Sequence, residues 1–201
     1  MSHYFENTDA PLVTRTITAT VFDNELDFLT AGGVFSGSRL DLGTSVLLRE
    51  VDPPMDGRVL DLGCGFGPIA VGLAVAEPGI TVDAIDVNER AVELTRRNAE
   101  RHGVADRVHP MTPDEVPDDR HYQEIWSNPP IRIGKQALHE LLLTWLPRLE
   151  DDGVAWLVVG KNLGADSLQG WLSDQGWPTE KLASAKGFRV FKVSRGLPER
   201  G

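Results

Sequence analysis

The sequence predicts an α/β protein built on a doubly wound, mostly parallel sheet, and three features of the 201-residue chain support that class. From Arg58 onward, short apolar runs alternate with stretches of helical periodicity, and repeated β-α units of this length specify such a sheet. Residues 154–159 are almost wholly apolar, as in a central strand covered on both faces. A glycine-rich turn at residues 61–67 joins a predicted strand to a predicted helix.

The first 35 residues differ from the rest and predict a β-hairpin ahead of the main domain. Residues 16–22 are rich in β-branched side chains, a turn-forming Asp-Asn pair follows, and a second apolar run ends at Leu29. Two glycines then break the pattern. We therefore expect an N-terminal hairpin extension over residues 1–35 and a main domain over residues 36–201.

The main domain is expected to open with a helix at residues 40–51, where apolar residues share one face and a Pro-Pro pair follows. A strand at residues 59–62 leads through the glycine-rich turn into an apolar helix at residues 68–76. The next strand spans residues 81–85. The helix at residues 89–102 then ends at a glycine, the residue most common at that position.

The rest of the chain continues the alternation of strand and helix. A strand ends at residues 125–127, and another spans residues 154–159. A last helix is expected at residues 166–175, before a closing antiparallel pair at residues 181–185 and 188–193. The helix that follows Lys135 is predicted to carry one apolar stripe, made of Leu138, Leu141, Leu142, Trp145, Leu146 and Leu149.

Charge and cysteine content exclude several classes of protein. A formal net charge of -10 argues against a protein that coats nucleic acid over a broad face. Residues 176–201 hold six Lys and Arg against two Glu, so they carry +4 and leave -14 for the rest. This pattern fits either a local basic edge on an acidic body or an ordinary solvated strand.

The chain has one cysteine, Cys64, and five histidines without metal-ligand spacing. It contains no apolar run of about 18 residues and no signal layout at its N-terminus. We therefore expect a cytoplasmic protein without a metal or a membrane partner, and a monomer or weak dimer.

The glycine-rich turn indicates a ligand site. Gly63, Gly65 and Gly67 let the backbone turn tightly and let a ligand approach it closely. Their spacing is not that of the dinucleotide fingerprint, and no Walker lysine follows. The carboxylate of Asp61 would repel a pyrophosphate but suits a ligand with an ammonium and a sulfonium. Asp86, after the second strand, can either accept two ribose hydroxyls or cap the next helix.

An Asn-Pro-Pro sequence, residues Asn128, Pro129 and Pro130, follows the strand that ends at residue 127. Ligands of open α/β sheets bind at this carboxyl edge. The Asn128 amide oxygen and the Pro129 carbonyl can accept the two hydrogens of a planar amino group. When these two acceptors bind both hydrogens of a substrate amino group, the lone pair of its nitrogen is favoured to point at a methyl group that is to be transferred. The alternative is that the prolines only end the strand.

Residues 59–86 resemble the S-adenosylmethionine site of the class I methyltransferases, which share a seven-stranded doubly wound sheet. The resemblance implies that the glycine turn holds the methionine end of the cofactor and that the acid after the second strand holds the ribose. It places the adenine contact near Thr112. The residues that take these roles are Asp61, Gly63, Gly65, Gly67 and Asp86.

The Asn-Pro-Pro sequence is typical of methyltransferases that act on adenine N6, guanine N2 or glutamine amide nitrogen. Residues 33–48, 128–135 and 164–168 are similar to the small-domain (MTS) methyltransferases, in their single-domain form, of the ribosomal RNA small-subunit guanine-N2 type. This likeness implies that Asp41 and Thr44 lie near the methionine end of the cofactor.

The chain departs from this pattern at one position. Many relatives have an aromatic residue after the two prolines, which can stack on a base, and here the residue is Ile131. Phe35 can supply an aromatic face instead. Arg132 and Lys135 are candidate phosphate contacts, or plain surface residues.

The sequence thus predicts an S-adenosylmethionine-dependent methyltransferase that modifies a guanine N2 amino group of ribosomal RNA, of the 16S type, either free or in the small subunit. The substrate supplies the nucleophile, so no catalytic His or Cys is needed. Two alternatives stay open. The overall acidity favours a protein glutamine N5-methyltransferase, although residues 33–48 disfavour it. A non-catalytic cofactor-binding module of ribosome assembly would not require the Asn-Pro-Pro sequence.

Overall fold

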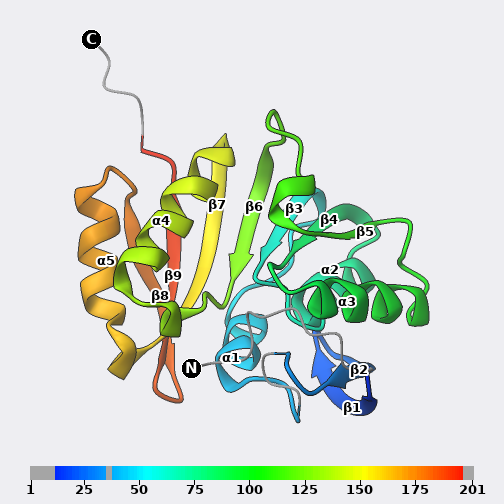
Figure 1. Ribbon diagram of the computed structural model, residues 1–201. Helices are drawn as coiled ribbons and strands as arrows, with labels where there is room; N and C mark the ends of the chain where they lie inside the picture. The colour runs from blue at the N-terminus through cyan, green and yellow to red at the C-terminus, as the bar shows by residue number, and fades with distance from the viewer. Residues whose placement is uncertain (1–11, 35–37, 197–201) are drawn as a thin grey trace.

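The computed structural model describes residues 12–34 and 38–196 (Figure 1). The helices are α1 (Leu42–Glu50), α2 (Pro68–Ala76), α3 (Glu89–Arg101), α4 (Lys135–Trp145) and α5 (Ala165–Asp174). The strands are β1 (Thr14–Val21), β2 (Asn24–Ala31), β3 (Asp56–Leu62), β4 (Gly79–Ile85), β5 (Val108–Met111), β6 (Tyr122–Ser127), β7 (Leu149–Gly160), β8 (Thr179–Ala185) and β9 (Phe188–Ser194). Short 3₁₀ turns lie at η2 (Pro113–Glu115), η3 (Ile131–Ile133), η4 (Leu146–Arg148) and η5 (Lys161–Leu163).

The main sheet has seven strands in the order β5-β4-β3-β6-β7-β9-β8. The first five run parallel, and β9 is antiparallel to both β7 and β8. The doubly wound sheet and its closing antiparallel pair are therefore confirmed. In Figure 1 the carboxyl ends of β3, β6 and β7 point toward α1, the start of α4 and the β8–β9 turn.

Helices cover both faces of the sheet. Alternate residues of a strand point to opposite faces, so Val59 packs with α1, α2 and α3, whereas Leu60 packs with α4 and α5. Both residues are fully buried. Residues 154–159 of the central strand β7 form a continuous apolar run because both faces of the sheet meet a helical layer.

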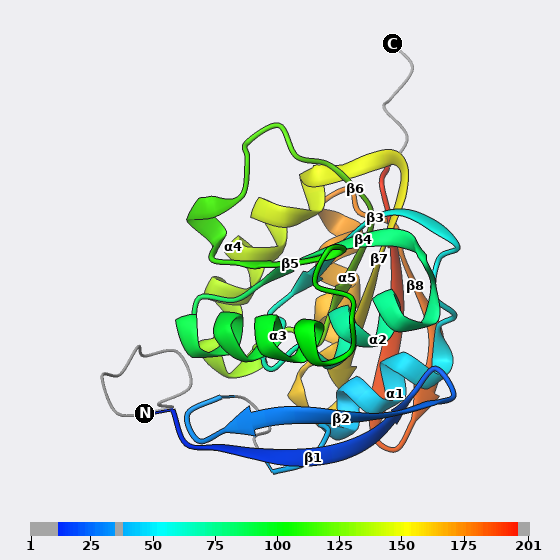
Figure 2. The same cartoon turned by 90° about the vertical axis from the view of Figure 1, so that its right-hand side faces the viewer.

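The predicted N-terminal hairpin is present as a separate two-stranded sheet, with β1 paired to β2 from Thr14↔Ala31 to Val21↔Asn24. It lies along the outer side of α1, α2 and α3 (Figure 2). Phe28 is fully buried, and its ring meets that of Phe66 edge-on at 5.7 Å between centroids. The hairpin thus contributes to the same apolar core as the helices.

The predicted stripe on the helix after Lys135 is wrong at its end. The α-helix stops at Trp145, residues 146–148 form the 3₁₀ turn η4, and Leu149 begins β7. Pro147 explains the difference, because it has no N–H to continue the helical hydrogen bonds and its ring clashes with the preceding turn. Leu146 and Leu149 are still buried in the core on this face, so an apolar pattern alone did not locate the helix end.

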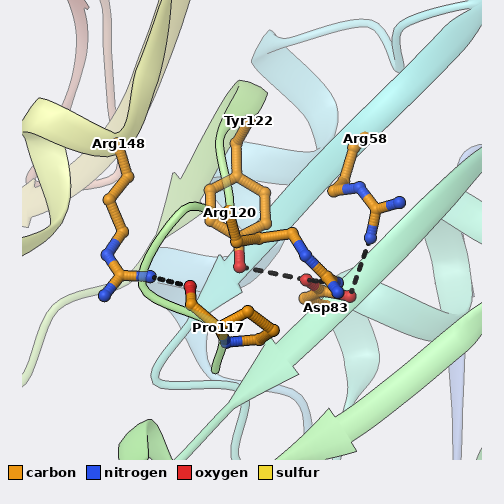
Figure 3. A network of polar contacts seen from close by, with 6 residues as sticks. All are labelled: Arg58, Asp83, Pro117, Arg120, Tyr122 and Arg148. Carbon is orange, nitrogen blue, oxygen red and sulfur yellow. Dashed lines mark hydrogen bonds and ion pairs between the residues drawn. The ribbon is translucent and has the colours of Figure 1, made fainter. Parts of the chain in front are cut away.

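A buried ionic network joins three neighbouring strands (Figure 3). The Asp83 side chain on β4 is fully buried, and its Oδ2 accepts hydrogen bonds from the Tyr122 hydroxyl at 3.0 Å and from Arg120 Nη1 at 2.9 Å. Arg58 Nη1 lies 3.8 Å from the Asp83 Oδ1 atom. Burial, followed by the charge of Asp83, raises the pKa of Tyr122 well above its ordinary value. Beside this network, Arg148 donates to the Pro117 carbonyl.

Candidate active site

The glycine turn between β3 and α2 leaves open space at the carboxyl edge of the sheet. Gly63, Gly65 and Gly67 have φ angles of +81°, +58° and +88°, which favour glycine. A Cβ atom added at Gly63 or Gly65 would meet no atom within 4 Å, so space for a ligand lies directly beside the backbone. At Gly67 it would come within 2.8 Å of Cγ2 of Thr95. Gly67 is therefore needed for the packing of α3, and the other two glycines leave room for a ligand.

Asp86 holds the glycine turn from the end of β4. Its Oδ2 accepts from the backbone N–H of Gly65 at 3.0 Å, and its Oδ1 accepts from that of Asn88 at 2.9 Å. The helix cap of α3 is Asn88, whose side chain accepts from the N–H of Arg90. Asp86 thus stabilises the glycine turn, and Asn88 rather than Asp86 caps helix α3. Burial raises the pKa of its carboxyl group.

Asp61, near the end of β3, is a buried acid, and no described residue provides it with a cationic partner. Its Oδ2 accepts from the backbone N–H of Ala70 at 3.0 Å, whereas its Oδ1 has no hydrogen-bond partner in the described part of the chain. Burial raises the pKa of Asp61 to about 7. An unpaired buried carboxylate oxygen is costly, and a positive charge on a ligand would relieve that cost. The uncompensated carboxyl group of Asp61 and the open space beside the glycine turn therefore fit a cationic ligand such as S-adenosylmethionine.

The Asn128 side chain is oriented by two residues that lie more than eighty positions earlier in the chain. Its Nδ2 donates to Asp41 Oδ2 at 2.8 Å and to Thr44 Oγ1 at 3.0 Å. Asp41 in turn caps α1 by accepting from the backbone N–H of Thr44 at 3.1 Å. Because both amide hydrogens are bound, the Asn128 Oδ1 remains as an acceptor.

The two prolines shape the backbone after Asn128. The Pro129 carbonyl accepts from the N–H of Ile131 at 2.8 Å, across Pro130 with φ -74° and ψ 74°. These angles are those of an inverse γ-turn. A carbonyl oxygen has two lone pairs, so Pro129 keeps one for another donor.

One cavity of about 300 Å³ brings most of the predicted residues together. A small pocket beside it joins Asp41, Gly63 and Asn128 to Thr44 and Gly65. The predicted site residues that line the main cavity are Asp41, Gly63, Asp86, Asn128, Pro129, Pro130, Ile131 and Arg132.

The remaining predicted residues in the described part of the chain line neither the main cavity nor the small pocket. Asp61 and Gly67 are buried at the end of β3 and in the glycine turn, without lining a cavity. The Thr112 hydroxyl donates to Glu115, and the next residue, Pro113, lines the main cavity. Lys135 lines an adjoining cavity of about 240 Å³. Phe35 lies outside the described residues.

Sequence reasoning missed Phe188, Leu163 and Trp145, which also line the main cavity. The start of β9 pairs with Gly160, the last residue of β7, so Phe188 reaches the same edge as the parallel strands' carboxyl ends. The predicted antiparallel pair held this information, because a strand antiparallel to its neighbour begins where that neighbour ends.

Residues 12–34 and 38–196 hold no group of three or more His, Cys, Asp or Glu placed to bind a metal ion. Among the helices described, none has the length and apolar character needed to cross a membrane.

Family comparison identifies the chain. The model of the methyltransferase small domain family matches residues 25–192. The chain belongs to this family. The match begins inside β2, so it includes part of the hairpin.

Two curated relatives illustrate the range of this methyltransferase family. The uncharacterized protein YbxB of Bacillus subtilis is 33% identical over 177 residues, which cover 86% of this chain and 88% of YbxB. The ribosomal RNA small subunit methyltransferase C of Aeromonas hydrophila is 38% identical over 130 residues, which cover 64% of this chain and 37% of the relative. The chain therefore aligns to well under half the length of that enzyme.

A solved structure shows the same fold. The T. thermophilus 16S rRNA N2 guanine methyltransferase, in complex with AdoMet and guanosine, matches with a TM-score of 0.79 and 20% identity. The match covers 92% of this chain and 51% of that one. The Rossmann-like methyltransferase fold is thus confirmed.

Proposed function

We propose that this protein is an S-adenosylmethionine-dependent methyltransferase that methylates the N2 amino group of a guanine in small-subunit ribosomal RNA. The observation that carries the proposal is the orientation of Asn128. Asp41 and Thr44 bind both hydrogens of its amide, so its oxygen is free to accept from a substrate amino group. The names of the A. hydrophila and T. thermophilus proteins support the choice of ribosomal RNA.

The cofactor side of the site is formed by β3, β4 and the glycine turn. S-adenosylmethionine, when bound, supplies an electrophilic methyl group on its sulfonium. Gly63 and Gly65 would leave room for its methionine end, and the buried carboxyl group of Asp61, near the end of β3, would balance its positive charge. The free lone pairs of Asp86 accept the ribose hydroxyls. Thr112, beside Pro113 of the cavity wall, is the proposed adenine contact.

The acceptor side of the site is formed by the Asn-Pro-Pro segment. Asn128 Oδ1 and the Pro129 carbonyl accept the two N–H groups of the guanine amine, which directs the nitrogen lone pair at the methyl group. Such alignment of reactants is worth up to about 7–11 kcal/mol of the barrier. Pro130 fixes the γ-turn, and Ile131 and Arg132 contact the base or its phosphate from the cavity wall. Phe35 and Lys135 are proposed as further substrate contacts.

Methyl transfer from labelled S-adenosylmethionine tests this function. The acceptors are small ribosomal subunits, naked ribosomal RNA and total cell protein, each with wild type and Asn128→Ala. We expect N2-methylguanosine as the product, and a kcat lower by about 10²–10³ in the variant, as for loss of an acceptor aimed at the reacting group. Asn162→Ala is the matched control, because Asn162 is exposed at the same edge of the sheet without lining the cavities.

Each outcome of the assay is decisive. Label in glutamine of a protein would replace the proposal with a glutamine N5-methyltransferase. Cofactor binding by calorimetry without transfer to any of the three acceptors would favour a non-catalytic module. Equal rates for Asn128→Ala and wild type would remove Asn128 from the mechanism.

A further inference from the structure

Four exposed cations lie in or next to segments that line the main cavity or the cavity adjoining it. Arg132 lies in η3, Lys135 begins α4, Lys161 begins η5 and Lys186 lies in the β8–β9 turn. We refer to these four residues as the basic rim. None of them forms an ion pair with an acidic residue in the described part of the chain. Their charges are therefore available to an anionic ligand.

Two residues of the basic rim line adjoining cavities, and the other two lie next to each other on neighbouring segments. Arg132 lines the main cavity and Lys135 lines the second cavity of about 240 Å³, and both cavities share Ile131 and Leu163. On the other side, the N–H of Lys161 donates to the Gly187 carbonyl at 2.8 Å, which brings it next to Lys186.

Most of the charge around the main cavity is divided between its two sides; the exception is Asp41, an acid on the acceptor side whose Oδ2 accepts from Asn128. Residues 128–138, 160–165 and 184–193, which carry the basic rim, contain no Asp or Glu. The first acids after two of these ranges are Glu140, which accepts from Gln136, and Asp166, which is paired with Arg189. On the cofactor side, Asp61 and Asp86 have no cationic partner among residues 12–34 and 38–196. A chain with a net charge of -10 thus presents a local basic surface beside its acceptor site.

The second cavity has an apolar wall. Leu138, Val159 and Leu168 line it together with Lys135 and Ser167. The cavity therefore combines an apolar interior with a cation at its edge. This combination matches a nucleotide, which has an apolar base face joined to an anionic phosphate, better than it matches an acidic peptide.

We propose that the basic rim binds the phosphates of a single-stranded RNA segment and that the second cavity holds the nucleotide next to the methylated guanine. This proposal rests on the proposed function, because it assigns the second cavity to the same substrate. It gives the strongly acidic chain a defined path for RNA past Asn128. An unpaired segment is required, since bases in a duplex cannot reach two adjoining cavities.

RNA affinity and its salt dependence test the basic rim. The probe is a labelled single-stranded RNA of about ten nucleotides with one guanine, measured by fluorescence anisotropy. Four phosphate contacts predict a slope of log affinity against log salt near -2.8, and thus about 50-fold weaker binding in 200 mM than in 50 mM salt. The variant Arg132→Gln, Lys135→Gln, Lys161→Gln, Lys186→Gln should lose most of this salt dependence.

A second fourfold variant controls for net charge. Arg96→Gln, Arg97→Gln, Arg101→Gln, Lys181→Gln removes the same number of exposed cations from α3 and β8, away from both cavities. We expect it to keep the salt slope of the wild type. If both fourfold variants change the slope equally, the overall field rather than the basic rim binds RNA, and the proposal is wrong.

The second cavity is tested by Ser167→Phe, which places a bulky side chain at an exposed position in its wall. We expect the KM for the RNA to rise at least tenfold, with an unchanged affinity for S-adenosylmethionine. An unchanged KM would overturn the role of this cavity. Tighter binding of an acidic peptide than of the RNA would overturn the choice of ligand.

These results separate the two proposals. If the wild type forms N2-methylguanosine while the basic-rim variant and Ser167→Phe behave like wild type, the further inference fails and the function stands. If the wild type labels protein instead of RNA, the function fails, and the anisotropy assay still decides whether the basic rim binds RNA.

Discussion

Asp61 on β3 and Asp83 on β4 lie on neighbouring strands, and both are fully buried. Asp83 accepts from the Tyr122 hydroxyl and lies beside the guanidinium groups of Arg120 and Arg58. Asp61 has one backbone amide as its partner. Each acid has one oxygen without a hydrogen bond among the described residues, but only that of Asp83 has a guanidinium beside it. The two carboxyl groups are equally removed from water, yet one is compensated by the chain and the other is not.

This difference separates an acid that the protein itself compensates from one that we propose to face the cofactor. A buried charge is tolerated when cations and hydrogen bonds surround it, as at Asp83. Where such partners are lacking, burial raises the pKa of the carboxyl group instead, as it does for Asp61. A positively charged ligand would then stabilise the ionised form of that group. The unpaired acid lies next to the glycine turn, and the paired one contacts the amino-terminal halves of β3 and β6.

The largest effect is expected for Asp83→Ala. The substitution leaves the Tyr122 hydroxyl without its acceptor and two guanidinium groups without their counter-ion. We expect the free energy of unfolding to fall by about 3 kcal/mol, at the lower end for broken buried pairs because both arginines reach water. Urea unfolding measures this. Asp61→Ala is the paired control, and it should lower the free energy of unfolding by less than half as much. An equal loss would contradict the distinction between the two acids.

A smaller loss is expected for Tyr122→Phe. The ring stays in the core, but the hydrogen bond from the hydroxyl to the buried carboxylate is removed. Such bonds to charged groups contribute about 1.5–3 kcal/mol, and Arg120 still neutralises Asp83, so we expect about 1.5 kcal/mol in urea unfolding. A loss near zero would mean that the arginines alone compensate Asp83.

Asp61 predicts a pH dependence of cofactor affinity. With its pKa raised from the usual 3.8 to about 7, the folded protein keeps this proton up to near pH 7, while the unfolded chain loses it earlier. The contribution of Asp61 to the free energy of unfolding therefore falls as the pH rises from about 3.8 to about 7. A cationic ligand favours the carboxylate, so affinity for S-adenosylmethionine should rise about tenfold from pH 6 to pH 8.

Calorimetry at several pH values checks this rise in affinity. Asp61→Asn cannot ionise, so its affinity should be lower at pH 8 and nearly flat across the range. If affinity changes with pH in the same way for the variant and the wild type, the ionisation of Asp61 does not affect cofactor binding.

The smallest effect is expected for Arg58→Gln. Arg58 is 3.8 Å from Asp83, and its side chain is 38% exposed. Pairs of this kind contribute about 0.5 kcal/mol and weaken in salt. Urea unfolding at low and high salt checks the value. A loss as large as that of Asp83→Ala would make Arg58 the main counter-ion of the network.

Sequence reasoning predicted the fold because most elements show their periodicity locally. It also found the glycine turn, Asp86 and the Asn-Pro-Pro segment, because each ends a strand at the same edge of the sheet. It did not reveal how Asn128 is oriented, since Asp41 and Thr44 are joined to it only by the folding of α1 against this edge. Contacts between residues more than eighty positions apart produce no regular spacing in the sequence from which they could be predicted.

The edge strand β5 was also hard to predict. It has four residues and contains Pro110, which lacks the N–H of a regular strand. At the sheet edge it pairs only with β4, so the missing donor costs little. Propensity alone cannot distinguish such a strand from a loop.

The Asn98 side chain has a consequence for exchange with solvent. This buried residue of α3 accepts from the Leu29 N–H at 2.7 Å, donates to the Leu29 carbonyl at 2.9 Å and donates to the Phe66 carbonyl at 2.7 Å. It therefore joins the hairpin to the loop that follows β3. The amide hydrogen of Leu29 can be replaced by deuterium only when the hairpin separates from α3, so its exchange rate reports how often the wall behind the glycine turn opens.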